Sequence, residues 1–221
     1  LYELKPGETL RELVIRAGGF TSDAYVYGSV FSRDSVRQEQ QKRMAEGLVR
    51  LEKNIERTSA RLQAETITPE LKESYAVQME AKRKSIARMR SAASIGRVVL
   101  ALSPSANSPN DFPKIALKDG DVLVVPSRMN EVHLFGEVYN QQSTIWRPGV
   151  TVLGALTSAG GPTKYADVKT MFIIRADGSV YSREQAGRRF TSIRLSPGDS
   201  VIVPEEVDYS TWKFELKEWS K

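Results

Sequence analysis

Few residues in this chain could perform acid–base, nucleophilic or metal chemistry. The sequence has one histidine, His133, and no cysteine. Thiolate metal sites and disulfides are therefore excluded, and a catalytic triad built on histidine would have to use His133. Because His133 falls in a predicted strand, a half-buried structural role is the simpler interpretation.

The acidic residues give no clearer sign of catalysis. Asp121 and Asp199 occupy equivalent turns, where hydrogen bonds to the backbone account for an aspartate. A pair of carboxylates that cleaves glycosides stays formally open, because a sequence does not reveal pairing in space. We expect no catalytic residue, no metal site, no cofactor and no enzymatic activity.

Aromatic and planar polar side chains are the candidates for contact with a sugar or with a neighbouring subunit. Trp146 and Arg147 flank a Pro-Gly turn, and Tyr165 follows a Gly-Gly pair. Tyr25 lies near the place that matches Tyr165 in an internal repeat described below, and we expect all four in surface loops. Trp146 has an equally good alternative role, which is to cover the core beside its turn.

The positive charge of the chain is concentrated in one segment. The formal net charge is +5, and residues 34–93 hold 13 Lys/Arg against 9 Asp/Glu. A candidate basic face for an acidic partner comprises Lys82, Arg83, Lys84, Arg88 and Arg90. The alternative is a solvated helix face. Nucleic-acid binding is disfavoured because acids are interleaved with the bases and no aromatic–basic alternation appears.

An internal repeat must position these residues. Residues 4–24 align with residues 146–166 at an offset of 142, and residues 115–126 align with residues 193–204 at an offset of 78. We call the span that begins with 4–24 and ends with 115–126 the first copy, and the span that begins with 146–166 and ends with 193–204 the second copy. The two offsets differ by 64 residues, so an insertion of about that length lies inside the first copy.

Each copy predicts a short helix followed by strands. Thr9 and Thr151 stand at N-cap positions after a Pro-Gly turn, and Glu12 completes a capping box with Thr9. Both helices end in Gly-Gly, which favours positive φ. The predicted strands, in chain order, are Val26–Ser32, Arg97–Leu102, Val122–Val125, Val132–Val138, Lys169–Ile174, Ser179–Ser182 and Ser200–Val203.

The insertion has the pattern of an antiparallel coiled-coil hairpin. Residues 37–66 and 69–93 carry apolar positions at heptad spacing, and Pro69 suits the first turn of the second helix. At 1.5 Å per residue the arm extends about 35–45 Å. The predicted seam consists of Met44, Leu48, Leu51, Ile55, Thr58 and Leu62 against Tyr75, Met79, Lys82, Ile86, Met89 and Ala93.

The predicted fold class is α+β, with two β-grasp-like modules, the first of which carries the helical hairpin. The first module takes residues 1–33 and 96–127, the hairpin takes 34–95, and the second module takes 130–206. Residues 207–221 form a C-terminal tail that leads towards a further segment. No run of 18 apolar residues occurs. The chain begins at Leu1 without a signal peptide, so we expect it to be a fragment of a longer protein.

With these motifs in view, the chain resembles the outer-membrane polysaccharide export proteins, whose recurring unit is the SLBB (soluble ligand-binding β-grasp) module. The resemblance rests on the strand of residues 132–138, the Pro-Gly-x-Thr turn, the Ala-Gly-Gly helix end and the Leu-x-x-Gly-Asp-x-(Val/Leu)-x-Val-Pro closure. The last three occur in both copies. The resemblance implies two tandem SLBB modules.

The resemblance also implies a function. It suggests a periplasmic part of a capsule or exopolysaccharide export channel, associated with the outer membrane of a Gram-negative bacterium. The expected partners are the polysaccharide, further copies of the chain in a homo-oligomer, and an inner-membrane polysaccharide co-polymerase of the tyrosine autokinase type. No nucleic-acid partner is expected. The alternative is a soluble carbohydrate receptor, which would be monomeric and would bind oligosaccharides directly.

Overall fold

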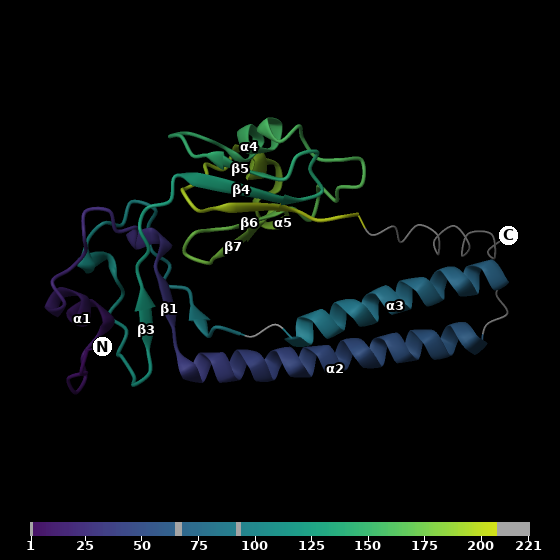
Figure 1. Cartoon of the computed structure of the whole chain (residues 1–221), viewed down its shortest axis with the longest axis horizontal. Coiled ribbons are helices and arrows are strands. Elements are labelled where there is room, and N and C mark those ends of the chain that lie inside the picture. Colours follow the sequence, from purple (N-terminus) through teal and green to yellow (C-terminus); the bar gives the residue numbers. More distant parts are fainter. Residues whose placement is uncertain (1, 65–67, 92–93, 207–221) are drawn as a thin grey trace. The chain divides into compact units, whose positions relative to one another are not determined.

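The structure is a computed structural model that describes residues 2–64, 68–91 and 94–206 (Figure 1). The chain divides into two compact units. The larger unit takes the chain up to Val30, Val99–Leu117 and the chain from Leu123 onwards. The smaller unit takes Phe31–Val98 and Lys118–Val122.

The larger unit begins with the short helix α1 (Leu10–Arg16), which is held by the predicted capping box. Thr9 Oγ1 accepts a hydrogen bond from the Glu12 N–H, and the Glu12 carboxylate accepts one from the Thr9 N–H. Such a box pairs donors that the first helical turn would otherwise leave unsatisfied. Leu10 and Val14 are buried on its inner face. After the C-cap residue Ala17 come Gly18 and Gly19, both with positive φ as predicted.

The larger unit also contains two 3₁₀ turns. They are η1 (Val26–Gly28) and η2 (Pro109–Asp111), and the Phe112 side chain next to η2 is completely buried. The prediction of one strand over Val26–Ser32 is therefore wrong in its first half. Only β1 (Val30–Ser32) is extended.

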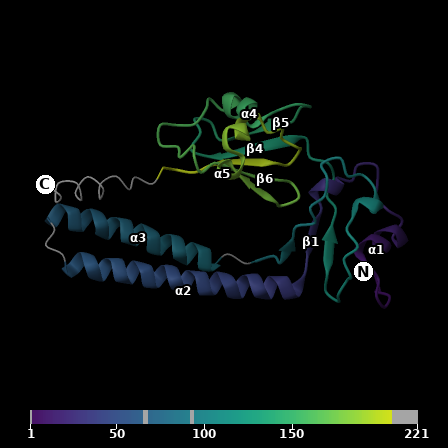
Figure 2. The same cartoon turned by 180° about the vertical axis from the view of Figure 1, so that it is seen from behind.

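A five-stranded sheet forms the rest of the larger unit. Its strands are β4 (Glu131–Gly136), β5 (Gln142–Ile145), β6 (Phe172–Ile174), β7 (Val180–Ser182) and β8 (Ser200–Val203). The order is β5-β4-β8-β6-β7, with β4 and β8 parallel and the other pairs antiparallel. Helix α4 (Val152–Ser158) covers one face of this sheet (Figures 1 and 2).

The core of the sheet follows from strand alternation. Along β4, Val132 and Leu134 are buried, and on β8 the buried residues are Val201 and Val203. Each such side chain contributes about 1.5–3 kcal/mol when removed from water. The parallel strands approach closely at Gly136, where an added Cβ would lie 2.0 Å from the Val203 carbonyl oxygen. Only glycine fits at that position.

The opposite face of the sheet is apolar but open. The register places Phe135, Ile202 and Phe172 in one row across β4, β8 and β6, and places Ile174 beside Val180. Phe135 and Val180 are exposed by 47% and 58%. This "open sheet face" is defined by Phe135, Phe172, Ile174, Val180 and Ile202.

The strand predictions overestimated several lengths. The Lys169–Ile174 strand shortens to β6, the Arg97–Leu102 strand shortens to β2 (Arg97–Val98), and Ser200–Val203 is confirmed. Strand β5 was not predicted, because its polar sequence Gln-Ser-Thr-Ile carries a weak local signal. Helix α5 (Arg183–Ala186) and the 3₁₀ helix η3 (Gly187–Ser192) were not predicted either.

The smaller unit consists of a long helical hairpin and the strands at its base. Helices α2 (Asp34–Ala64) and α3 (Pro69–Ser91) run side by side in opposite directions in both views (Figures 1 and 2). At the base, β1 pairs antiparallel with β2, and Ser32 lies opposite Arg97. The sheet order is β2-β1-β3, with β3 at Val122–Val124. The inserted antiparallel hairpin is thus confirmed.

The hairpin seam is narrower than predicted. Leu48 and Ile55 on α2 and Met79 and Ile86 on α3 form a buried cluster, which is one residue per heptad on each helix. The other apolar seam positions are more open, with exposures of 37% for Met44, 46% for Leu51 and 49% for Met89. Thr58 and Lys82 are exposed and Tyr75 is half-buried, while the side chains of Leu62 and Ala93 lie outside the description.

The internal repeat is also a repeat of contacts. The Leu10 N–H donates to the Ile115 carbonyl, and the equivalent Val152 N–H donates to the Ile193 carbonyl. The isolated bridges repeat in the same way, as Thr9–Ala116 with Thr151–Arg194 and as Ala24–Ser127 with Ala166–Glu205. Both offsets found in the sequence therefore recur as equivalent hydrogen bonds.

Candidate functional site

Trp146 lies at the edge of the sheet core and is half-buried. It packs against the buried core of the five-stranded sheet, and its indole Nε1–H donates to the Leu195 carbonyl at 2.7 Å. The Arg128 guanidinium lies 5.8 Å from the ring centroid. These contacts favour the alternative left open by the sequence, in which Trp146 covers the core beside its turn.

Arg147 and Tyr165 are on the surface, as predicted, but on separate loops. Arg147 follows β5 and lines a shallow hollow with Ile145 and Gly154. Tyr165 follows α4 and is 58% exposed, with the Lys164 ammonium 4.8 Å from its ring centroid. The described contacts do not bring the two side chains together.

Tyr25 is buried, so its expected surface position is wrong. Its hydroxyl donates to the Pro197 carbonyl at 2.8 Å, and its ring meets Tyr27 edge-on with the centroids 6.1 Å apart. Burial, reinforced by the nearby Asp199 carboxylate, raises the pKa of the Tyr25 phenol well above its usual range. Tyr25 is positioned to join parts of the core rather than to stack on a sugar.

The five basic residues proposed on the hairpin do not form one face. Lys82, Arg83 and Lys84 are consecutive on α3, so their side chains leave the helix in directions about 100° apart. Arg90 bonds across the hairpin to the Glu52 carboxylate at 2.7 Å. Arg88 and the three consecutive residues are exposed. The pattern is that of a solvated helix in which Arg90 forms an ion pair with the other helix.

His133 has the half-buried position in a strand that was predicted. Its Nδ1 lies 2.8 Å from Ser143 Oγ, and its ring stacks on Phe135 with the centroids 6.0 Å apart. Within residues 2–64, 68–91 and 94–206, no group of three His, Cys, Asp or Glu side chains is arranged to hold a metal ion.

Asp121 and Asp199 each bind an arginine of the same copy. Arg33 makes two bonds to the Asp121 carboxylate (2.9 and 2.7 Å), and Arg175 makes one of 2.7 Å to Asp199. Burial opposes ionisation of Asp121, but the Arg33 bonds and the Lys118 N–H prevail and lower its pKa. At Asp199 burial prevails and raises the pKa. Both aspartates thus have the turn role that the sequence suggested, reinforced by an arginine.

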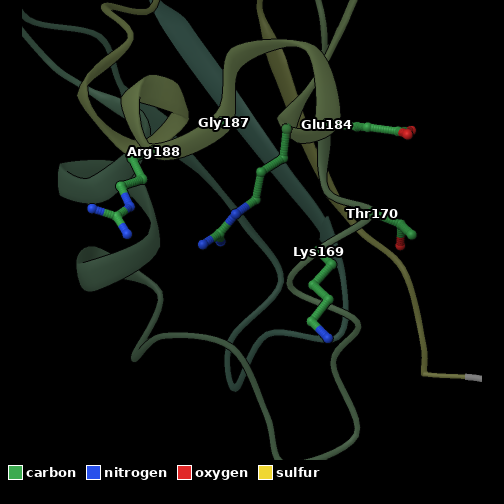
Figure 3. Close-up of a pocket in the computed structure, with 6 residues that line it drawn as sticks. Lys169, Thr170, Glu184, Gly187 and Arg188 are labelled. Carbon is green, nitrogen blue, oxygen red and sulfur yellow. The ribbon is translucent and has the colours of Figure 1, made fainter.

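A basic pocket in the second copy is the best candidate for a ligand site (Figure 3). It has a volume of about 570 Å³. Its lining residues are Lys169, Thr170, Arg183, Glu184, Gly187 and Arg188. In Figure 3 the Glu184 carboxylate points away from the Arg188 guanidinium. We call this the basic pocket.

Local hydrogen bonds fix the backbone around the basic pocket. The Asp167 carboxylate accepts bonds from the Lys169 and Thr170 N–H groups, and the Thr170 hydroxyl, with these N–H groups, lowers the Asp167 pKa. Ser182 and Gln185 form a capping box at the start of α5. The box is followed by Gly187, whose φ of +57° only glycine adopts readily.

The sequence contained a signal for this pocket that was not read. Ser182-x-x-Gln185 is a capping-box pattern and announces a helix start. The run that follows, Arg183 to Arg189, holds three arginines and one glutamate. A short helix bearing those arginines was therefore predictable, but its closeness to Lys169 depends on β6 and β7 pairing, which brings the Arg183 N–H to the Met171 carbonyl at 2.8 Å.

Comparison with protein families adds one finding. Residues 1–38 and 132–184 match the family model of the SLBB domain. The chain thus contains SLBB-domain sequence split into two stretches, with the α2–α3 hairpin between them. Four lining residues of the basic pocket lie near the end of the second stretch, whereas Gly187 and Arg188 lie just beyond it. A search of curated proteins finds no significant match.

The hairpin helices are amphipathic and charged. Across the described residues, no helix is both long and apolar enough to cross a bilayer.

Proposed function

We propose that this chain is a periplasmic part of a channel that exports capsular or extracellular polysaccharide. In this role it is a non-enzymatic assembly and conduit module, associated with the outer membrane of a Gram-negative bacterium. The carrying observation is SLBB-domain sequence at 1–38 and 132–184. The repeated hydrogen bonds support reading the two copies as tandem SLBB modules.

Assembly requires surfaces that associate. The open sheet face supports this part of the proposal. Ile174 and Val180 expose apolar area side by side on β6 and β7, and Phe135 on β4 exposes more in the row it shares with Ile202 and Phe172. Contiguous apolar patches often mark interaction sites. The proposed partners are further copies of this chain, the exported polysaccharide, and an inner-membrane co-polymerase of the tyrosine autokinase type.

Gene deletion in the native bacterium tests the export role. Loss of the protein should remove polysaccharide from the cell surface and leave polymer inside the cell envelope, measured by fractionation and sugar analysis. Complementation with the intact gene should restore surface polymer. Unchanged surface polysaccharide in the deletion strain contradicts the proposal.

A soluble carbohydrate receptor is the second candidate, and the basic pocket favours it. A receptor would be a monomer that binds oligosaccharide measurably, whereas a conduit protein would oligomerise and bind free sugar weakly. Measuring mass and affinity on the same preparation separates the two.

A further inference from the structure

We infer that the basic pocket binds the anionic substituents, carboxylate or phosphate, of an acidic polysaccharide. This inference rests on the proposed function for the kind of polymer involved. It goes further by assigning a ligand chemistry to the three cationic residues Lys169, Arg183 and Arg188.

The first argument is that these three cations have no carboxylate partner among the residues that the structure describes. In the part of the chain that the structure describes, no carboxylate lies within 4.0 Å of the charged groups of Lys169, Arg183 or Arg188. The nearby Asp167 carboxylate is already bonded to the Lys169 and Thr170 N–H groups. Three like charges around one hollow repel one another, and an anion placed among them relieves that repulsion.

The second argument is that the charge is local. Residues 130–206 contain eight Lys/Arg and eight Asp/Glu, so this segment carries no net charge. Three of its eight cations line one pocket, and among the described lining residues Glu184 is the only acid, so overall basicity does not explain the cluster. A local positive field concentrates anionic ligands at the pocket.

The third argument concerns which anion fits. A volume of about 570 Å³ lies within the range of small-ligand sites, which suits individual sugar units better than a broad protein interface. Arginine forks match the geometry of carboxylate and phosphate groups. The Thr170 hydroxyl in the lining offers an acceptor for a sugar hydroxyl.

A nucleic acid fits less well. Single strands are held by aromatic side chains on which bases stack, together with basic residues. Among the described residues, none that lines the basic pocket is aromatic. We therefore expect the pocket to recognise the acidic groups of a sugar chain and not a base.

Titration of the purified chain with tetragalacturonate tests the carboxylate arm, and titration with a phosphorylated mannan oligosaccharide tests the phosphate arm. Amide NMR shifts should saturate and cluster at residues 169–170 and 183–188, and affinity should fall as salt is added. Neutral dextran oligosaccharides of the same length should cause no such shifts. Binding of either acidic glycan at these residues supports the inference, and binding of neither overturns it.

Substitutions locate the site. The double variant R183Q/R188Q should weaken binding at least tenfold, because each arginine contributes a charge-assisted hydrogen bond. Arg189→Gln removes one positive charge, against two in the double variant, from an adjacent exposed position outside the lining and should change affinity less than about twofold. If the double variant fails to fold, Lys169→Gln, at an exposed loop residue, takes its place with an expected loss of about threefold or more.

Polyglutamate and a single-stranded oligonucleotide serve as competing polyanions. Equal affinity for either at these amides overturns the assignment to polysaccharide, as does equal loss of binding in Arg189→Gln and in the double variant. This binding assay does not depend on export. If gene deletion blocks export but the purified chain binds neither glycan, only the pocket assignment is wrong. If the purified chain binds the glycan but deletion leaves export intact, only the export role is wrong.

Discussion

At the scale of single residues, the strongest repeated feature is one arginine–aspartate pair per copy. The Asp199 side chain is fully buried, and the Arg175 side chain that binds it is 18% exposed. Arg33 and Asp121 repeat this pair at the same offsets as the rest of the repeat. Removing one member of a buried pair leaves an uncompensated group, which costs more than the pair itself contributes.

Arg175→Met should therefore lower the free energy of unfolding by about 2–4 kcal/mol, as measured by urea denaturation. Burial already raises the Asp199 pKa, and loss of Arg175 raises it further. An acidic group whose pKa is higher in the folded state than in the unfolded state destabilises the fold. This destabilisation grows as pH rises from the unfolded-state pKa to the folded-state pKa. The loss should thus be larger at pH 7 than near pH 4. Arg147→Met, at an exposed arginine, should change stability by less than about 0.5 kcal/mol.

The contribution of Glu8 to stability changes with pH in the opposite direction to that of Asp199. Its carboxylate accepts two bonds from Arg16 and one from the Lys5 N–H, and the Arg16 bonds are the main reason that its pKa falls to about 2. The stability it contributes is present above the ordinary value of 4.5 and is lost as pH falls towards about 2.

Glu8→Gln should lower the thermal midpoint at pH 7, and its difference from the native chain should shrink below about pH 4.5. Differential scanning calorimetry across pH measures this. Glu3→Gln is the control. A difference that stays constant down to pH 2 contradicts the assigned linkage.

At the scale of elements, four buried side chains among the described residues hold the two hairpin helices together. Ile55→Asn should reduce the helical circular dichroism signal and lower the hairpin's melting temperature, because it puts a polar group into the cluster of Leu48, Ile55, Met79 and Ile86. Leu51→Asn is the matched control, since Leu51 is 46% exposed although it also fits the heptad pattern. Equal effects of the two variants contradict the narrow seam.

The hairpin should also be dispensable for folding. The Arg33 N–H donates to the Gly96 carbonyl at 3.0 Å, so the chain leaves and re-enters the small sheet at one place. Replacing residues 34–95 with Ala-Asp lets a two-residue turn join β1 to β2, as the second copy joins its own strands. The shortened chain should unfold in one cooperative transition in urea. A product without such a transition contradicts this prediction.

At the scale of the whole molecule, the conduit proposal predicts self-association. Sedimentation equilibrium over a wide concentration range should reveal oligomers. Val180→Lys, which charges the open sheet face, should shift the population towards monomer, whereas Val49→Lys on the exposed surface of α2 should not. A strict monomer at every concentration favours the receptor alternative.

The part of this structure that the sequence predicts depends on how far apart along the chain the interacting residues lie. The Thr9 and Thr151 caps, both Gly-Gly helix ends and the hairpin were predictable because each depends on residues within a few turns. Strand β5 was not, because its pairing with β4 holds a polar sequence in place. Tyr25 was misplaced for a related reason, since its hydroxyl partner at Pro197 lies 172 positions away in the chain.

The candidate site follows the same rule. Its arginines and the Ser182–Gln185 capping box were readable, but the sequence could not show that Lys169 shares a hollow with Arg183 and Arg188. That depends on the β6–β7 register. The four aromatic and basic residues first proposed for sugar contact were chosen by side-chain type, which carries no information about burial.

The closing of the chain at the hairpin base has an evolutionary consequence. Gly96 has positive φ, and a Cβ there would lie 2.5 Å from the Arg33 carbonyl oxygen, so the exit and entry points are fixed together. One added heptad on each helix would lengthen the arm by about 10 Å and leave the β1–β2 register unchanged. The length of the hairpin can therefore change during evolution without any adjustment in the sheet to which the hairpin is attached.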